Sequence, residues 1–210
     1  MKTRCTALLV ALAACASLPV RAVAQATTRA PRPQAPYVTA ACPFECCTYG
    51  RWRFVTAAPV RAAARPTAAV VARIGAGERV RTDSGHVRLD TLGLVLVRRD
   101  FRDADAGAEY RAGDTLLVLD YLGEGFSHVW VRGERRQLSL VDVLASHGPI
   151  SGADTATLVE LRPPAAAWWV HVTLSARAPK APKTTRGWVL MTPELDVRGA
   201  DACGGPDEGP

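Results

Sequence analysis

Apolar and polar residues alternate with a period of two in many short stretches of this chain. Trp52 and Phe54, for example, alternate with arginines. Successive side chains of a β-strand point to opposite faces of its sheet, so this alternation indicates strands with one buried face. Glycine, aspartate or proline ends nearly every stretch, as is typical of turns between strands. The pattern predicts an all-β protein, a barrel or a sandwich, and only 138–146 also fits a helical period. Further stretches lie at 70–74, 79–81, 87–89, 92–97, 115–122, 128–132, 137–143, 168–174 and 187–191.

Two segments of the chain carry a more specific pattern. Residues 58–80 read APVRAAARPTAAVVARIGAGERV, and residues 168–190 contain WWVHV followed by RGWV. These segments resemble the opening and the ending of bacterial SH3 (SH3b) domains, which open with V-R-x-x-P, V-[VI] and G-[ED]-x-V and end with W-x-x-V and G-W-V. Alanines replace the usual asparagine or glycine near the start, and Pro66 falls slightly late. The resemblance implies a small SH3-like β-barrel.

Almost ninety residues separate the two matched segments, which is more than an SH3b loop normally holds. Two arrangements of the region 42–203 account for them. In the first, one SH3-like barrel carries a long β insertion at about 87–166. In the second, two SH3-like halves intertwine, because short echoes relate 76–80 to 112–116 and 169–172 to 128–131. We favour the second arrangement, a single compact unit of two intertwined halves.

The first 24 residues have the layout of a secretory signal peptide. Basic residues precede an apolar stretch at 7–16, and the small-residue site AVA ends at Ala24. Cleavage after Ala24 predicts an exported protein, periplasmic or extracellular. An overlapping alternative is the lipobox-like sequence LAAC, in which Cys15 is lipidated and the protein is an outer-membrane lipoprotein.

The segments that flank the predicted domain are polar or irregular. Residues 25–41 are mostly alanine, threonine, proline and arginine without apolar periodicity, which predicts a flexible tether. Residues 204–210 are predicted to be a disordered tail. We expect no transmembrane segment, because the longest apolar candidate, 158–174, contains charged residues and two prolines. A lipid anchor would come only from Cys15.

The positive charge of the chain is weaker than its total suggests. There are 26 basic and 20 acidic residues, but three basic residues lie in the predicted leader, and its removal leaves a formal charge of +3. The remaining arginines are scattered singly along the alternating stretches and form no continuous basic stripe. We therefore expect no nucleic-acid partner.

Four cysteines lie near the two ends of the predicted mature chain: Cys42, Cys46 and Cys47 in the cluster CPFECC, and Cys203. In an oxidising compartment such thiols form disulfides. Neighbouring cysteines rarely bond each other, so we expect Cys203 to bond Cys46 or Cys47, with Cys42 taking the other. The alternative is a thiol redox or metal-handling site, but the spacing matches neither C-x-x-C nor a zinc-ligand pattern. We expect structural disulfides, no metal and no other cofactor.

No catalytic motif is complete in this chain. Residues 146–150, SHGPI, resemble the motif around the nucleophile of L,D-transpeptidases, but Pro149 stands where that chemistry requires a cysteine thiolate. The chain also lacks a G-x-S-x-G elbow, an H-E-x-x-H pair and a phosphate-binding glycine loop. We therefore expect no catalytic residues and no enzymatic activity.

Aromatic residues gather in the second half of the chain. Alternation along the strand sends Trp168 to one face and Trp169 to the other, so we expect only one of them in the core. The alternative is that these tryptophans are all core residues. The SH3b resemblance implies a binding module for cell-wall peptide, that is peptidoglycan, or for another envelope protein. Its expected ligand contacts are Trp169, Tyr121, Phe126 and Trp130. Other functions left open are a redox or metal-handling protein using the four cysteines and a structural lipoprotein anchored at Cys15.

Overall fold

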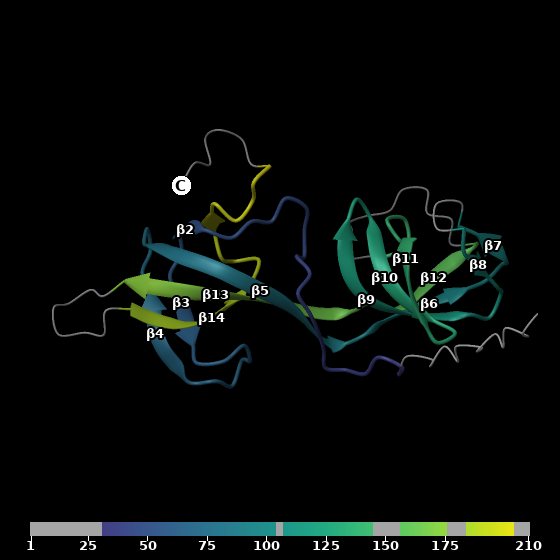
Figure 1. Cartoon of the computed structure of the whole chain (residues 1–210), viewed down its shortest axis with the longest axis horizontal. Helices are drawn as coiled ribbons and strands as arrows, with labels where there is room; N and C mark the ends of the chain where they lie inside the picture. Colours follow the sequence, from purple (N-terminus) through teal and green to yellow (C-terminus); the bar gives the residue numbers. More distant parts are fainter. Residues whose placement is uncertain (1–30, 104–106, 145–155, 176–183, 204–210) are drawn as a thin grey trace, which may run out of the picture.

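The computed structural model describes residues 31–103, 107–144, 156–175 and 184–203. Every regular element in these residues is a strand, which confirms the predicted all-β class. The strands form two lobes that lie one after the other along the long axis of the molecule (Figure 1).

The first lobe is a curled eight-stranded sheet that makes half a barrel. Its strands are β1 (Tyr37–Thr39), β2 (Arg51–Phe54), β3 (Ala58–Arg61), β4 (Val70–Ile74), β5 (Arg79–Thr91), β13 (Ala165–Ser175), β14 (Thr184–Met191) and β15 (Val197–Arg198). They follow the order β15-β2-β5-β13-β14-β3-β4, with β1 paired to β5. The long strands β5 and β13 therefore lie at the middle of the sheet.

The inserted lobe is a five-stranded sheet with a small hairpin at its far end (Figure 1). The sheet contains β6 (Gly93–Val97), β9 (Thr115–Gly123), β10 (Phe126–Val131), β11 (Glu134–Ser139) and β12 (Leu158–Arg162), and the hairpin contains β7 (Phe101–Arg102) and β8 (Glu109–Tyr110). The sheet has the order β11-β10-β9-β6-β12, and its neighbours are antiparallel.

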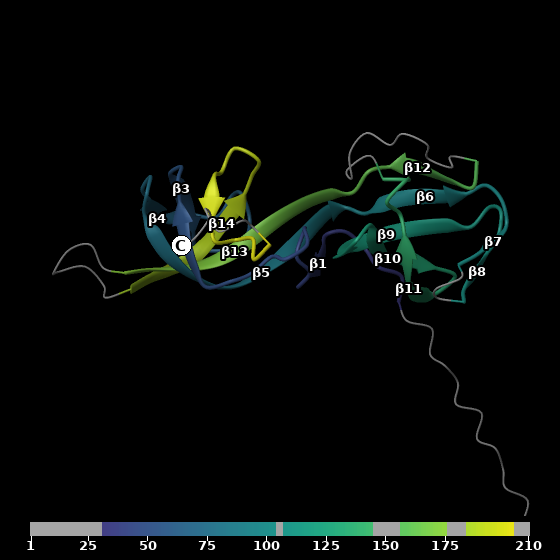
Figure 2. The same ribbon diagram turned by 90° about the horizontal axis from the view of Figure 1, so that it is seen from above.

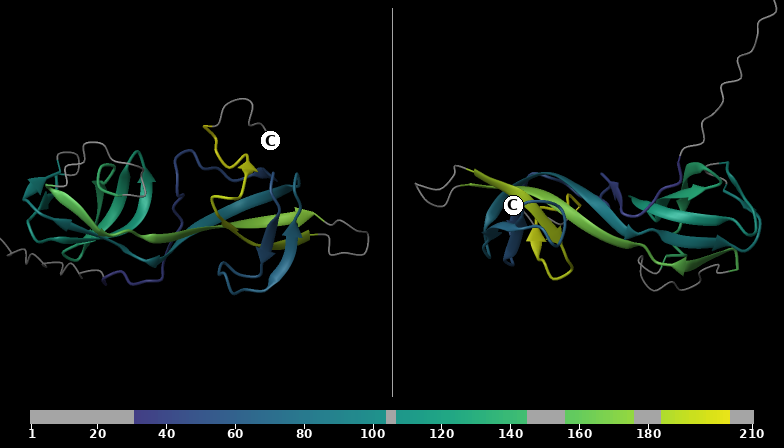
Figure 3. Two further views of the ribbon diagram at one scale, coloured as in Figure 1. Left: turned by 180° about the vertical axis from the view of Figure 1, so that it is seen from behind. Right: turned by 90° about the horizontal axis from the view of Figure 1, so that it is seen from below.

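An antiparallel ribbon of two strands, with one break in its pairing, joins the lobes, as Figure 2 and Figure 3 show from above, behind and below. Strand β5 continues into β6 after Leu92 alone, and β12 continues into β13 after Pro163 and Pro164. Proline has no N–H to donate to a ladder, so the pairing is interrupted at this point. Arg162 Nε donates instead to the Leu92 carbonyl at 3.2 Å. A side chain at Gly93 would meet Pro164 Cδ at 3.1 Å, so glycine permits the close packing of the break.

The path of the chain follows the insertion arrangement and differs from the favoured arrangement of two intertwined halves. The strands between Leu92 and Pro163 pair only with one another, so the two sheets share no strand. The echoes that suggested intertwining fall in different sheets, since 76–80 leads into β5 and 112–116 leads into β9. The first echo marks a glycine turn followed by a strand, and the second, 169–172 and 128–131, lies within β13 and β10. Any antiparallel sheet repeats such patterns.

Two clusters of buried side chains form the cores of the molecule, and the first contains residues of both lobes. It surrounds Trp52 and Val170 of the first sheet and continues to Trp130 of the inserted sheet. The second is mainly aliphatic and lies around Leu116 and Val129 on the other face of the inserted sheet. Residues 116–120 are buried on both faces, which explains why β9 is an apolar run and does not alternate.

Two disulfide bonds join the cysteine cluster and the C-terminal segment. Cys42 bonds Cys47, and Cys46 bonds Cys203. The expected disulfide bonding of the four cysteines is therefore present, in one of the two expected pairings. Backbone hydrogen bonds reinforce it, since Ala202 N–H donates to the Cys46 carbonyl at 2.8 Å.

The N-terminal segment is more ordered than the predicted tether. Residues 37–39 pair with 87–89 of β5, so β-structure begins inside the segment 25–41. Residues 31–36 contain no regular element. The predicted leader, Cys15 and the predicted tail at 204–210 lie outside the described residues.

Candidate functional site

A groove with a volume of about 590 Å³ opens between the two lobes, beside the ribbon. Strands β5, β9 and β13 form its floor and walls, the loop after β11 closes one side, and the disulfide loop at 42–45 forms its roof. A cavity of this size lies within the range of about 300–1,000 Å³ that is typical of small-ligand sites. Apolar residues that line it are Val87, Leu89, Val118, Val141, Leu144 and Ala166.

The roof is held by the covalent and aromatic contacts of the first lobe. The Cys42–Cys47 bond closes a short loop that carries Phe44. The Phe44 ring meets the Trp168 ring edge-on with centroids 5.4 Å apart, and Trp168 packs against Trp52 at 5.7 Å. Edge-on contacts of this kind are favourable beyond the area that they bury, so Phe44 is anchored on the first core cluster.

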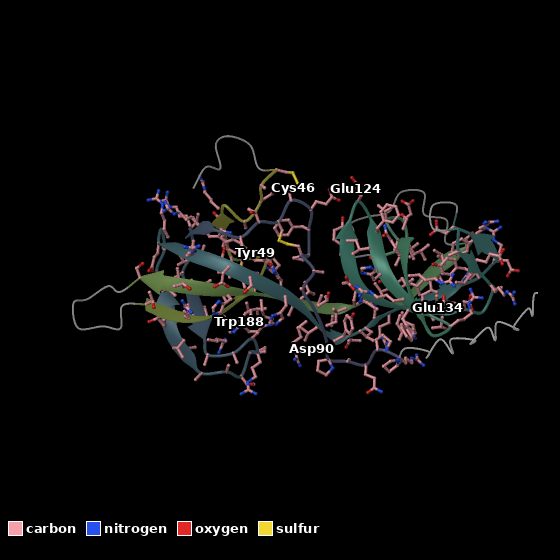
Figure 4. The ribbon with its side chains drawn as sticks, viewed as in Figure 1. Cys46, Tyr49, Asp90, Glu124, Glu134 and Trp188 are labelled. Atoms are coloured by element: carbon pink, nitrogen blue, oxygen red, sulfur yellow. A yellow bond between two sulfur atoms is a disulfide. The ribbon has the colours of Figure 1, made fainter. Side chains whose placement is uncertain are left out.

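Glu45, the next residue of the roof, reaches across to the inserted lobe. Its Oε1 accepts hydrogen bonds from the Tyr121 hydroxyl at 3.0 Å and from the Glu124 backbone N–H. Glu124 has a φ of 51° and lies between Gly123 and Gly125, which also have positive φ, so the turn between β9 and β10 is tight. We call Glu45 and Glu124 the lip of the groove, and Figure 4 shows Glu124 on the turn opposite the roof loop of Cys46.

A network of three charged or polar side chains stiffens the wall formed by the inserted sheet. The Asp120 side chain is 2% exposed and lines the groove. Its carboxylate lies 2.8 Å from His128 Nδ1 and 3.3 Å from Arg135 Nη2, and the same Arg135 nitrogen lies 2.6 Å from His128 Nδ1. A buried carboxylate needs such partners. Asp120 is therefore already compensated and offers little free charge to a ligand.

A second hollow, of about 500 Å³, lies on the other side of the lip. It shares Phe44 and both lip residues with the groove and adds Leu122 and Phe126. Leu122 is 41% exposed, so an apolar side chain is available there. The two hollows form one surface that continues across the lip.

The four aromatic residues predicted as ligand contacts lie in different places. Tyr121 lines the groove, and Phe126 lines the second hollow. Trp130 is buried in the first core cluster, and Trp169 has no exposed surface. The structure brings Tyr121 and Phe126 together near the lip and leaves the two tryptophans away from it.

The expected exposure of Trp169 is corrected by the structure. That expectation treats the second face of β13 as open to solvent. On this face Trp169 has His86 and Leu190 as cross-strand neighbours, and the Trp188 ring lies 4.8 Å from His86 and 5.1 Å from His171. Side chains cover both faces of the sheet here, so the adjacent tryptophans Trp168 and Trp169 are both buried.

Sequence reasoning missed the residues of the roof and the lip. Phe44 and Glu45 lie between cysteines that bond across a tight loop, where Phe44 packs against Trp168 and Glu45 is exposed at the groove. The sequence CPFECC predicts this loop only when the Cys42–Cys47 pairing is known. The contact between the turn at 123–125 and Glu45 depends on the fold.

The metal-handling alternative meets a chemical obstacle. Among the described residues, Cys46, Asp201 and Cys203 are the group of three side chains close enough to share a metal ion. The two sulfurs are bonded to each other, so in this state neither offers the thiolate that binds a metal ion. The transpeptidase-like SHGPI sequence, at 146–150, lies outside the described residues.

Disulfide bonds are compatible with an exported protein. Within the described ranges, no helix has the length and apolarity needed to cross a bilayer. Comparisons of this chain with protein-family models, with curated proteins and with solved structures found no match.

Proposed function

We propose that this protein is a non-catalytic, exported binding module that recognises cell-wall peptide or another envelope protein. The observation that carries the proposal is the apolar groove between the lobes, with the second hollow beyond its lip. An apolar cavity with a few polar groups at defined places is the usual form of a binding site.

An SH3b-like character of the first lobe is part of this proposal. The segment 58–80 covers β3, β4 and the start of β5, and the segment 168–190 covers most of β13 and β14. In the sheet order, β13, β14, β3 and β4 are consecutive neighbours. Two segments that match the opening and the ending of an SH3b domain thus lie side by side, which supports the resemblance.

The chemistry of the groove favours binding over catalysis. Its ionisable lining residues are Glu45, Asp120, Tyr121 and Glu124, and Asp120 is held in ion pairs. Nucleophilic catalysis needs an activated hydroxyl, thiol or amine beside a base. The Tyr121 hydroxyl lies beside the Glu45 carboxylate, and that contact joins the roof to the hairpin. The redox alternative is tested separately by counting free thiols in native protein, because a redox site needs cysteines that can be present as free thiols.

The test measures how much of the oxidised mature protein is retained by purified peptidoglycan sacculi and by envelope proteins extracted with detergent. Ala166→Trp places a large ring in the groove, because Ala166 is exposed and lines it. Ala165→Trp is the matched control, since Ala165 is also exposed on β13 and does not line the groove. We expect retention of the wild type and of Ala165→Trp, and its loss in Ala166→Trp. Equal retention of the two variants would show that the groove is not the site.

A further inference from the structure

We infer that the groove selects a peptide segment in which a basic side chain lies next to an apolar one. This inference rests on the proposed function and adds the chemical class of the ligand. It comes from three features of the groove: its apolar walls, the sign of its charge and a serine hydroxyl inside it.

The apolar walls determine what enters the groove. Val87 and Leu89 from the ribbon face Val118 of the inserted sheet and Val141 of the loop after β11. The Leu140 N–H donates to the Gly125 carbonyl at 2.8 Å, which fixes that loop beside the hairpin. A branched aliphatic side chain would bury its surface here, at the usual gain for apolar area removed from water.

The charge at the entrance is negative in a chain with an excess of basic residues. The chain has 26 basic and 20 acidic residues, yet no lysine, arginine or histidine among the described residues lines either hollow. Glu45 and Glu124 lie in both linings and form no salt bridge with the described part of the chain. The lip therefore complements a cation and disfavours an anion.

The interior of the groove also contains a hydroxyl. Ser127 lines the groove, is 1% exposed and lies among its apolar walls. A ligand that can hydrogen-bond to this hydroxyl is favoured over a purely apolar occupant. A peptide group offers both a donor and an acceptor.

The second hollow favours an extended chain over a compact cation. The surface continues from the groove, past Phe44 and the lip, to Leu122 and Phe126. A peptide placed along this surface puts an apolar side chain between the lobes and the next side chain at Glu45 and Glu124. A simple amine or a lipid headgroup would contact only Glu45 and Glu124 and leave the apolar walls uncovered.

The experiment is an NMR titration of the ¹⁵N-labelled oxidised full mature protein with three short peptides, acetylated and amidated at their ends. The probe is Ala-Leu-Arg-Ala, and the comparison peptides are Ala-Leu-Glu-Ala and Ala-Ser-Arg-Ala. We expect the probe to shift amides of the groove, including Leu119 and Ser127, and the comparison peptides to shift them much less. Spermidine is titrated in parallel as a cation without a peptide group.

Two carboxamide variants test the role of the lip. Glu124→Gln should weaken binding of the probe about twofold to fivefold and reduce its salt dependence. Glu134→Gln is the matched control, because Glu134 is exposed on β11 and lines neither hollow (Figure 4). Equal weakening in the two variants would contradict the assigned role of the lip.

The other outcomes separate this inference from the proposed function. If the three peptides shift the groove equally, or none does at millimolar concentration, the inference on ligand class is overturned. The proposed function still stands in that case if retention on envelope material depends on Ala166. If spermidine alone matches the probe, the site is a cation site and the peptide class is wrong.

Discussion

The two lobes reach a stable core by different means. The first lobe contains both disulfides and an aromatic cluster in which Trp52 contacts Tyr49 and Trp168. The second core cluster, in the inserted lobe, is mainly aliphatic, and a charged network on β9, β10 and β11 crosses the sheet. A covalently closed lobe thus carries a second lobe that depends on close packing. The groove lies where the rigid roof of the first meets a turn of the second.

The largest effect that distinguishes the lobes is expected from the longer disulfide. Cys46 and Cys203 are 157 residues apart in sequence, so the bond restricts a long loop of the unfolded chain. Replacing both with serine should lower the free energy of unfolding by about 3 to 5 kcal/mol. Urea unfolding followed by tryptophan fluorescence measures the loss, because four of the five tryptophans lie in the first lobe. An unchanged midpoint would show that backbone pairing alone holds the ends together.

A cavity in the aliphatic core tests how far the inserted lobe depends on packing. Leu116 is fully buried in the second cluster, so Leu116→Ala should destabilise the protein by about 2 to 4 kcal/mol. Leu161→Ala is the control, because Leu161 lies in the same lobe and is 54% exposed. It should change stability by less than about 0.5 kcal/mol. Similar losses in the two variants would mean that this core is not closely packed.

Removing the contact between roof and hairpin should have a smaller, local effect. Glu45→Ala deletes the acceptor used by Tyr121 and by the Glu124 N–H, at a cost of about 1 kcal/mol. Amide hydrogen exchange should accelerate at Glu124 and remain unchanged in the strands of the first lobe. Glu109→Ala serves as the control, since Glu109 is exposed at the far end of the inserted lobe. Unchanged exchange at Glu124 would show that the turn holds its shape without the roof.

The smallest expected effect is a dependence on pH in the first lobe. Partial burial, together with the positive charge of Arg88, lowers the pKa of His86 from its ordinary value of 6.5. The unfolded chain therefore binds a proton at a higher pH than the folded one, so stability falls as the pH drops below about 6.5. His86→Gln should flatten the curve of unfolding free energy against pH in that window. Measurement at pH 8, where His86 is neutral in both states, provides the baseline, and an equally steep curve in the variant would exclude His86 as its source.

The sequence predicted the parts of this molecule that depend on local rules. Alternation located many of the strands, although it predicted 137–143 where β11 covers Glu134–Ser139 and did not indicate β12. The distance between neighbouring cysteines excluded a Cys46–Cys47 bond. The sequence could not locate the groove, because Phe44 and Tyr121 come to line one groove only in the fold. Alternation also failed for Trp169, since it assumes that one face of every strand is open to solvent.

The break in the ribbon at Leu92 and Pro163–Pro164 has a consequence for variation in chain length. The inserted lobe leaves and re-enters the first sheet through strands that are already paired, with Thr91 opposite Ala165. A two-residue turn closes antiparallel strands at the same spacing. The segment between these residues can therefore differ in length without changing the register of the first sheet, if it still supplies side chains such as Leu117 and Trp130 to the first core cluster. Related chains would then superpose over the first lobe while differing greatly in length. The number of residues between the segments that correspond to 58–80 and 168–190 would then be a poor guide to whether two chains are related.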